Sequence, residues 1–353
     1  MRRFVLALTL VVASAAGAAA QAPAAPPKPK PEPALRRYVE FQQFVLSTRY
    51  RFIENNGDVT TSNHEQYREQ IRIRGNFDRK KRFGVVTGLY SGTNFIASWD
   101  NLGPGTGEFD GHDHFMRQLY FSAAPVAGVE GQVGGIYVNR GETTEYIGYD
   151  DDGYLVGGRV SVRRPKSLYF DEVSVTRAAL TKTNTPSVWK RWEDFDNPNY
   201  TQVLASKRFS TMTASSVDYT RVAGVTTMRG AISLRFKAKA PLASLRYEQY
   251  VRATGPNKAA GFAVQAERSL TKYVRLQGGY VTVDERYGNL NSDRIQRGRR
   301  FYALANVPIK GPLSASFFAT RALHSPYSVS NKVRFDAVIA YDVAALLRQT
   351  GVF

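Results

Sequence analysis

Apolar and polar side chains alternate with period two along residues 66–77. The apolar set is Tyr67, Ile71, Ile73 and Phe77, and the polar set is Gln66, Arg68, Gln70, Arg72, Arg74 and Asn76. A β-strand sends successive side chains to opposite faces, whereas a helix would spread these arginines around its circumference. Glu69 is the one charged residue at an apolar position. The pattern predicts a strand with one apolar wall and one cationic wall.

The same unit, about ten alternating residues followed by a break, recurs along the chain from residue 38 onward. We expect strands at residues 41–53, 66–77, 83–90, 115–123, 131–138, 154–162, 168–177, 200–209, 211–221, 228–239, 242–252, 261–268, 273–283, 299–307, 313–322 and 333–343. The breaks alternate between long and short, which places the long ones and the short ones on opposite edges of the sheet. Outer-membrane barrels have this arrangement, with both termini on the short-turn edge.

The predicted fold is therefore all-β: a transmembrane antiparallel up-and-down β-barrel of about 16 strands over residues 38–343. Two soluble β-sandwich or lipocalin-like domains would show the same alternation, with the apolar face turned inward. Strand number favours the membrane barrel, because a closed ring of about 16 strands is too wide for side chains to fill.

The N-terminus carries the features of an exported protein. Arg2 and Arg3 precede an apolar run at residues 4–18, and alanines at 18–20 supply a cleavage pattern, so residues 1–20 are predicted to be a signal peptide. An uncleaved anchor is the alternative. Residues 21–37 are rich in Pro and Lys and predict an extended periplasmic lead-in, and residues 344–353 follow the barrel as a C-terminal tail. The chain contains no cysteine, so it has no disulfide framework.

Basic residues dominate the polar strand faces. The chain has 48 Lys and Arg against 30 Asp and Glu, a net charge of +18. A charged side chain facing lipid costs ~2–4 kcal/mol at the membrane midplane, so these residues are expected to line the lumen. The candidate pore-lining, anion-selecting residues are Arg49, Arg51, Arg68, Arg72, Arg74, Arg159, Arg229, Arg235, Lys237, Arg246, Arg275 and Arg334. Rings of basic residues favour anions. In the alternative interpretation these charges pair with acidic loop residues and only keep the lumen solvated.

The connection at residues 140–153 is the candidate constriction loop. Its acidic residues are Glu142, Glu145, Asp150, Asp151 and Asp152. Folded inward against a basic wall, the loop would create a transverse field, whereas an outward loop would be a solvated turn. A second connection contains Trp189-Lys190-Arg191-Trp192, which is typical of an interfacial aromatic anchor, with a lipopolysaccharide or sugar contact as alternatives.

Other chemistries lack support in the sequence. His112-Asp113-His114 and Asp150–Asp152 lack the further ligands of a metal site, and no cofactor-binding or hydrolase motif is present. We therefore expect no metal, no cofactor and no enzymatic activity. Basic residues between aromatic ones also occur in nucleic-acid-binding proteins, but the export signal and the strand alternation argue against that partner.

The mature region, ending in the alternating strand of residues 332–341, resembles a Gram-negative outer-membrane porin. The resemblance implies a passive diffusion channel in the outer membrane, contacts with lipid and lipopolysaccharide, insertion by the barrel-assembly machinery, and the trimeric state that porins typically adopt. It also implies a C-terminal aromatic assembly signal, for which Tyr341 and Phe353 are the candidates.

The basic lumen makes small anionic hydrophilic solutes the expected cargo of such a channel. A weaker resemblance is to alginate-export-type barrels, carried by Arg117-Gln118-Leu119-Tyr120 and by residues 134–141 (GGIYVNRG). That resemblance implies a channel for an acidic polysaccharide or its oligomers and is the alternative function.

Overall fold

The computed structural model describes most of the chain after its N-terminal segment. The described residues are 37–92, 99–105, 114–144, 154–163, 169–180, 187–237, 240–254, 259–271, 273–284, 295–325 and 330–349. The predicted signal peptide and nearly all of the lead-in lie outside these residues, so both stay predictions.

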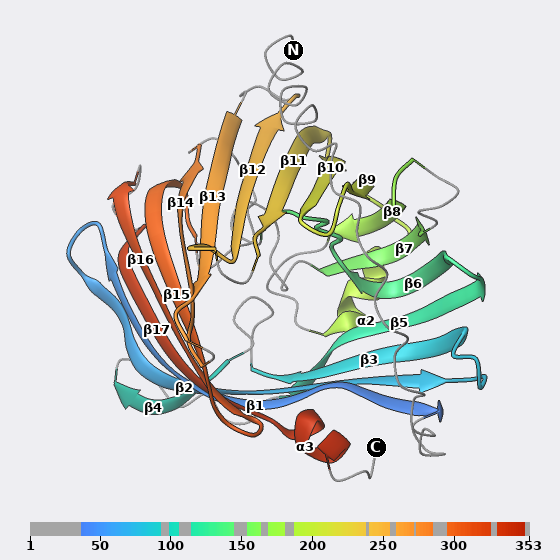
Figure 1. The fold of residues 1–353 in the computed structure, drawn as a ribbon. Helices are drawn as coiled ribbons and strands as arrows, with labels where there is room; N and C mark the ends of the chain where they lie inside the picture. Colours follow the sequence, from blue (N-terminus) through green and yellow to red (C-terminus); the bar gives the residue numbers. More distant parts are fainter. Residues whose placement is uncertain are drawn as a thin grey trace. The chain divides into compact units, whose positions relative to one another are not determined.

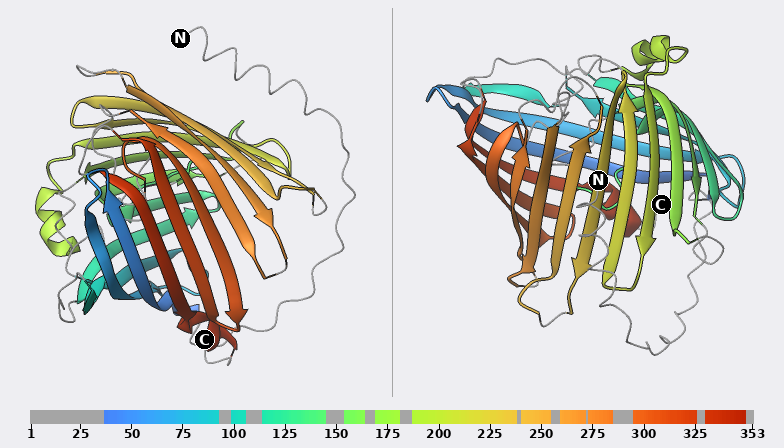
Figure 2. Two further views of the ribbon diagram at one scale, coloured as in Figure 1. Left: turned by 90° about the vertical axis from the view of Figure 1, so that its left-hand side faces the viewer. Right: turned by 90° about the horizontal axis from the view of Figure 1, so that it is seen from above.

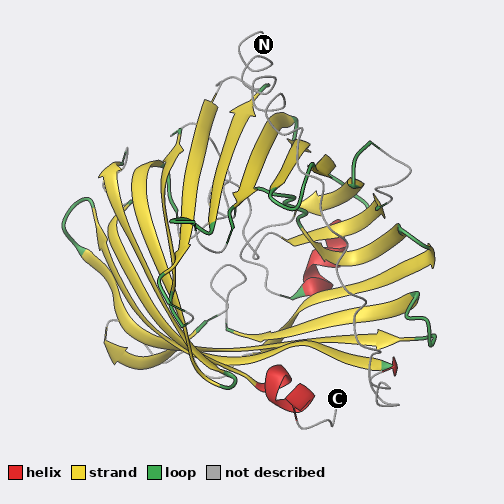
Figure 3. Ribbon diagram, viewed as in Figure 1, coloured by secondary structure: helices red, strands yellow, loops and turns green. Residues whose placement is uncertain are grey.

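The described part of the chain is built almost entirely of β-strands, with short helices in a connection and at the C-terminus (Figure 3). The strands are β1 (Val39–Asn55), β2 (Thr60–Asn76), β3 (Phe83–Ser91), β4 (Asp100–Gly105), β5 (His114–Val126), β6 (Val129–Tyr137), β7 (Tyr154–Val162), β8 (Glu172–Leu180), β9 (Tyr200–Arg208), β10 (Thr213–Val222), β11 (Val225–Arg235), β12 (Ser244–Arg252), β13 (Ala259–Ser269), β14 (Arg275–Val283), β15 (Gly298–Lys310), β16 (Leu313–His324) and β17 (Asn331–Asp342). The helices are α2 (Val188–Arg191), the 3-10 turn η2 (Trp192–Asp194) and α3 (Val343–Gln349).

The sheet closes on itself. Each strand of the ring pairs antiparallel with its neighbour, and the last strand, β17, pairs with β1 through a register that sets Arg51 opposite Asp336 (Figure 1). β4 stands apart from the ring, because it pairs with β2 beyond the point where β3 ends, while β3 pairs directly with β5. The ring therefore has 16 strands, and the prediction of an antiparallel up-and-down barrel of this size is confirmed.

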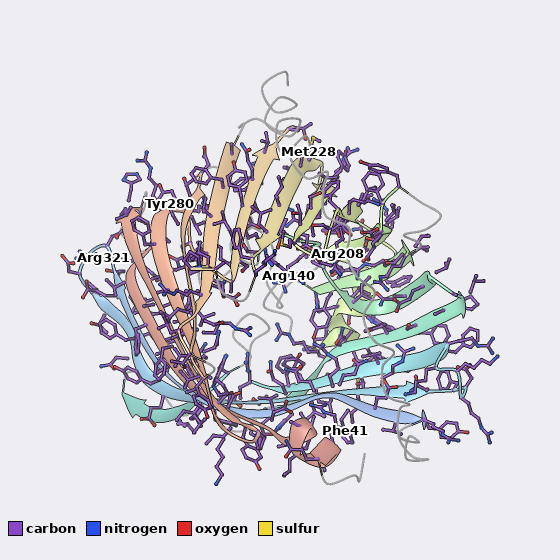
Figure 4. The ribbon with its side chains drawn as sticks, viewed as in Figure 1. Phe41, Arg140, Arg208, Met228, Tyr280 and Arg321 are labelled. Atoms are coloured by element: carbon purple, nitrogen blue, oxygen red, sulfur yellow. The ribbon has the colours of Figure 1, made fainter. Side chains whose placement is uncertain are left out.

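The two faces of the barrel wall are inverted relative to those of a soluble barrel. On β1, the apolar side chains of Leu46 and Tyr50 are each 40% exposed, whereas Arg49 and Arg51, on either side of Tyr50 in the sequence, are 6% and 9% exposed. Figure 4 shows the same division, with Arg321 pointing away from the ring and Arg140 lying inside it. Because a soluble barrel buries its apolar face, the two-domain soluble alternative is excluded in favour of a barrel whose apolar face is turned to lipid.

The edges of the barrel follow the predicted pattern with several exceptions. On the long-loop edge, the predicted long break after the first strand was wrong, because β2 begins at Thr60 and only residues 56–59 join it to β1. On the short-turn edge, β11 ends at Arg235 and β12 begins at Ser244, so that connection is longer than expected.

Ala223 and Gly224 form a two-residue hairpin between β10 and β11 on the long-loop edge, with φ angles of 46° and 85°. Paired positive φ angles suit the primed turns that join twisted strands. The prediction of a long break before residue 228 was therefore wrong, because β11 already begins at Val225. On the short-turn edge, β8 begins at Glu172 and not at residue 168, which makes that turn longer than expected.

The C-terminal tail begins as a helix. The Asp342 carboxylate accepts a hydrogen bond of 2.9 Å from the backbone N–H of Ala345, which is a normal N-cap for α3. α3 lies against β1, and Ala344 is buried. None of the helices in the described residues is long and apolar enough to cross a membrane. Tyr341 is the penultimate residue of β17 and is 36% exposed, and Phe353 lies outside the described residues, so the assembly signal stays a prediction.

Candidate functional site: the inner wall of the barrel

The strand register places the predicted basic residues on the inner face of the wall. Arg49 stands opposite Gln66, and Arg159 stands opposite both Gln132 and Thr176, all on the polar face. By the same alternation the inner face carries Arg51, Arg68, Arg72, Arg74, Arg229, Arg235, Arg246, Arg275 and Arg334. The placement is geometric.

Three of the predicted residues lie apart from the others, near the short-turn edge. Arg235 and Arg275 are exposed at strand ends, and Arg275 forms a 3.2 Å ion pair with Glu267. Lys237 lies beyond the end of β11, although the sequence pattern predicted a strand continuing to residue 239. These positions lie outside the group of stacked and paired arginines described below.

Two arginines of the basic wall lie over one indole ring. The guanidinium carbons of Arg49 and Arg68 are 4.1 and 4.4 Å from the centroid of Trp99. Trp99 is buried and immediately precedes β4, whose Asn101 accepts a 2.8 Å hydrogen bond from Gln66 Nε2. Cation–π contacts stabilise a guanidinium without neutralising its charge. The β3–β5 connection therefore helps to fix two cations on the inner face.

A second cluster joins two arginines through two tyrosines. Arg72 donates hydrogen bonds to the hydroxyls of Tyr90 and Tyr137, and these hydroxyls are 3.0 Å apart. Arg117 lies over the Tyr90 ring at 4.8 Å. Arg117 was not among the predicted lining residues, because strict alternation from Tyr120 places it on the outer face. A β-bulge opposite Gly88 shifts the alternation and buries the Arg117 side chain.

Arg74 and Arg159 extend the basic wall through neutral partners. Arg74 Nε donates to Asn76 Oδ1 at 2.8 Å, and Arg159 Nε donates to Thr176 Oγ1 at 3.0 Å. Arg159 also donates to the backbone carbonyl of Tyr137. Hydrogen bonds to neutral acceptors orient a guanidinium while leaving its charge in place.

On the neighbouring strands β1 and β17, two arginines share one carboxylate. Asp336 Oδ1 accepts from Arg51 Nε at 3.0 Å, and Asp336 Oδ2 lies 2.6 Å from Arg334 Nη2. All three side chains are nearly inaccessible to solvent. Two cations and one anion leave this group with a net positive charge.

Two further buried arginines are bound tightly by the wall itself. On β10 and β11, Arg229 forms a two-point ion pair with Asp218, with contacts of 3.1 and 3.0 Å. Arg300 was not predicted, and it donates to the backbone carbonyls of Gln296, Arg297 and Asn331. Arg300 therefore ties connecting segments to the barrel, and its three carbonyl contacts indicate a structural role.

The segment after β6 crosses the inner face of four other strands. Asn139 Nδ2 donates to Ser174 Oγ at 3.0 Å, and Gln202 Nε2 donates to the Asn139 carbonyl at 2.7 Å. The backbone N–H of Glu142 donates to Ser216 Oγ at 2.8 Å. Thr144 then donates to the Glu248 carboxylate through its backbone N–H and its hydroxyl. We call residues 139–144 the crossing segment. Glu145, Asp150, Asp151 and Asp152 lie outside the described residues.

Replacing Thr144 and Glu248 together by cysteine is expected to join the crossing segment to β12 by a disulfide under mild oxidation. Their side chains touch, and the chain has no other cysteine to compete. A reductant-sensitive change in gel mobility of the heat-denatured protein would report the bond. The matched control pairs Thr144→Cys with Tyr247→Cys, since Tyr247 is exposed on the outer face. Equal cross-linking of both pairs would contradict the position of the crossing segment.

Among the described residues, no group of three or more His, Asp or Glu side chains is arranged to hold a metal ion. His114, the described member of the predicted histidine pair, instead lies 2.7 Å from Glu69 on the outer face. This contact gives Glu69, the one charge on the apolar face of its strand, a polar partner.

Comparisons with known proteins agree on the fold. A mutant form of the porin of Rhodopseudomonas blastica superposes with a TM-score of 0.56 at 10% sequence identity, covering 86% of this chain and 99% of the porin. Salmonella typhi OmpF, solved in complex with daunomycin, gives a TM-score of 0.55 at 12% identity, with coverage of 86% and 97%. The chain has the Gram-negative porin fold. No protein-family model matches the sequence, and no curated protein matches it either.

Proposed function

We propose that the protein is an outer-membrane porin, a passive diffusion channel that favours small anionic hydrophilic solutes. The porin fold and the outward apolar face support the membrane setting and the outer-membrane location. Rings of this strand number enclose an aqueous channel and not a packed core. Neither transport down a gradient nor the contacts described above require a cofactor.

The observation that carries the anion preference is the group of arginines on β1, β2, β5 and β7. The side chains of Arg49, Arg68, Arg72 and Arg159 lie against rings, hydroxyls and amides, while Arg51 shares the Asp336 carboxylate with Arg334. The neutral contacts hold a cation in place and preserve its field. A channel with low-dielectric walls concentrates that field and raises the local anion concentration.

The crossing segment supports a narrowing of the channel at its level. It lies inside the ring against β8, β9, β10 and β12, and it brings Glu142 onto the side of the barrel opposite the basic strands β1 and β2 (Figure 1). The carboxylate of Glu142 opposite a basic wall would produce an electric field across the channel. Such a field orients dipolar solutes as they permeate.

Planar-bilayer recording tests the proposal. In a tenfold gradient of potassium chloride, the reversal potential of the pore should have the sign of chloride preference. Absence of a pore would refute the channel function, and the sign of potassium preference would refute the anion selectivity. Adding uronate oligomers addresses the acidic-polysaccharide alternative, because a dedicated polysaccharide channel would show current block at low oligomer concentration.

A further inference from the structure

We propose that Trp189, Trp192 and Phe195 form a binding site for an uncharged saccharide at the mouth of the barrel. We call these three side chains the aromatic platform. The site goes beyond the proposed anion preference, because it lies on the β8–β9 connection and not on the basic wall. It uses different residues and binds through different chemistry.

The platform exposes an unusual amount of aromatic surface within seven residues. Trp189 is 53% exposed, Trp192 is 38% exposed and Phe195 is 46% exposed. The two indole centroids are 5.4 Å apart at an interplanar angle of 63°, so their faces are not stacked on each other. Contiguous exposed aromatic surface on a connecting segment is typical of an interaction site.

The backbone that presents the platform is firmly anchored. Val188 and Arg191, the first and last residues of α2, are buried at 0% and 1% exposure. Val188 packs where Gly135 lacks a side chain, since a Cβ at that glycine would lie 2.5 Å from Val188 Cγ2. Further along, the backbone N–H of Phe195 donates to the Trp192 carbonyl at 3.0 Å. A fixed backbone reduces the entropy lost on binding.

The position of α2 favours a solute over lipid. Figure 2 shows α2 projecting beyond the strand ends, and Figure 1 shows it within the outline of the ring, beside β5. Aromatic side chains that anchor a barrel in lipid lie on the outer face at the membrane boundaries. The helix that begins the platform segment instead lies at the end of the barrel and within its outline, which speaks against the interfacial-anchor interpretation of the sequence.

The chemistry around the rings fits the two sides of a sugar. The apolar C–H face of a pyranose stacks on an indole, while its hydroxyls need hydrogen-bond acceptors and donors at the rim. Lys190, Glu193, Asp194 and Asp196 are all exposed between or beside the aromatic residues. Three carboxylates against one ammonium disfavour the phosphates of lipopolysaccharide. The occupant is therefore a soluble, uncharged oligosaccharide.

Isothermal titration of maltohexaose into the full-length protein in detergent tests the site. The wild type should show saturable heat, and the variant W189A/W192A should lose affinity by on the order of tenfold or more. Tyr169→Ala is the matched control, because Tyr169 is 71% exposed near the opposite, short-turn edge of the barrel. The affinity of this variant for maltohexaose should equal that of the wild type. Absence of heat with the wild type, or an unchanged affinity in the double variant, would overturn the proposal.

Two further measurements distinguish a soluble saccharide from lipopolysaccharide and separate sugar binding from ion selectivity. Purified lipopolysaccharide that binds in a tryptophan-dependent way, with no response to maltohexaose, would overturn the soluble-saccharide assignment. The reversal potential of W189A/W192A should equal that of the wild type, because the basic wall is intact. Loss of sugar binding thus leaves the anion preference standing, and cation preference in the wild type would leave the sugar site standing.

Discussion

Replacing Arg68 and Arg72 together by glutamine is expected to lower the anion-to-cation permeability ratio by about threefold to tenfold. A single charge about 6 Å from a permeating ion in water contributes about 0.7 kcal/mol, which changes the local anion concentration about threefold. Both residues lie on the inner face of β2 and are held against the Trp99 and Tyr137 rings. The change should be read from the reversal potential, and it should shrink at high salt because the field is screened.

Two variants separate charge from shape in this experiment. Replacing both arginines by lysine keeps the charge, so most of the anion preference should remain. Arg321→Gln removes one positive charge from the outer face (Figure 4) and should leave the ratio unchanged. If the Arg321 variant moves the reversal potential as far as the β2 variant does, the selectivity does not arise from the inner wall.

The period-two pattern was sufficient to predict the wall. The alternating residues 66–76 lie in β2, where Ile71 and Ile73 occupy one face and Arg72 and Arg74 occupy the other. A one-residue slip in strand pairing would turn every apolar side chain of the strand to the polar face. A clear alternation of apolar and polar residues therefore fixes the register of the strand. Strand number and the inward basic residues follow from that periodicity.

The pattern failed where the backbone departs from regular pairing. Arg117 turns inward at a β-bulge that strict alternation cannot reveal. The Ala223–Gly224 hairpin is short because both residues adopt positive φ, which a count of polar residues does not detect. Trp99 gives no local signal of its own, because its contacts with Arg49 and Arg68 come from strands far away in the sequence. Contacts of this kind depend on tertiary structure.

Asp336→Ala is expected to be the most destabilising single substitution proposed for the barrel wall. Asp336 contacts the guanidinium groups of Arg51 and Arg334, and both ion pairs are shielded from solvent. Removing one partner of a buried ion pair typically costs about 3–5 kcal/mol, because the remaining charge has lost both solvent and its counter-charge. The free energy of unfolding should be measured by urea titration of the protein reconstituted in lipid vesicles.

The matched control is Asp58→Ala, which removes a carboxylate from the same side of the barrel. Asp58 pairs with Lys332, but the two side chains are 70% and 39% exposed, so water already screens the pair and the change should be small. Asp336→Asn keeps the shape and a hydrogen-bond acceptor, so its cost should fall between the two. Equal losses for Asp58→Ala and Asp336→Ala would contradict a strong pairing at Asp336. A large loss confined to Asp336 would show that one carboxylate is needed to hold two cations together at the β1–β17 closure, where the first and last strands of the ring meet.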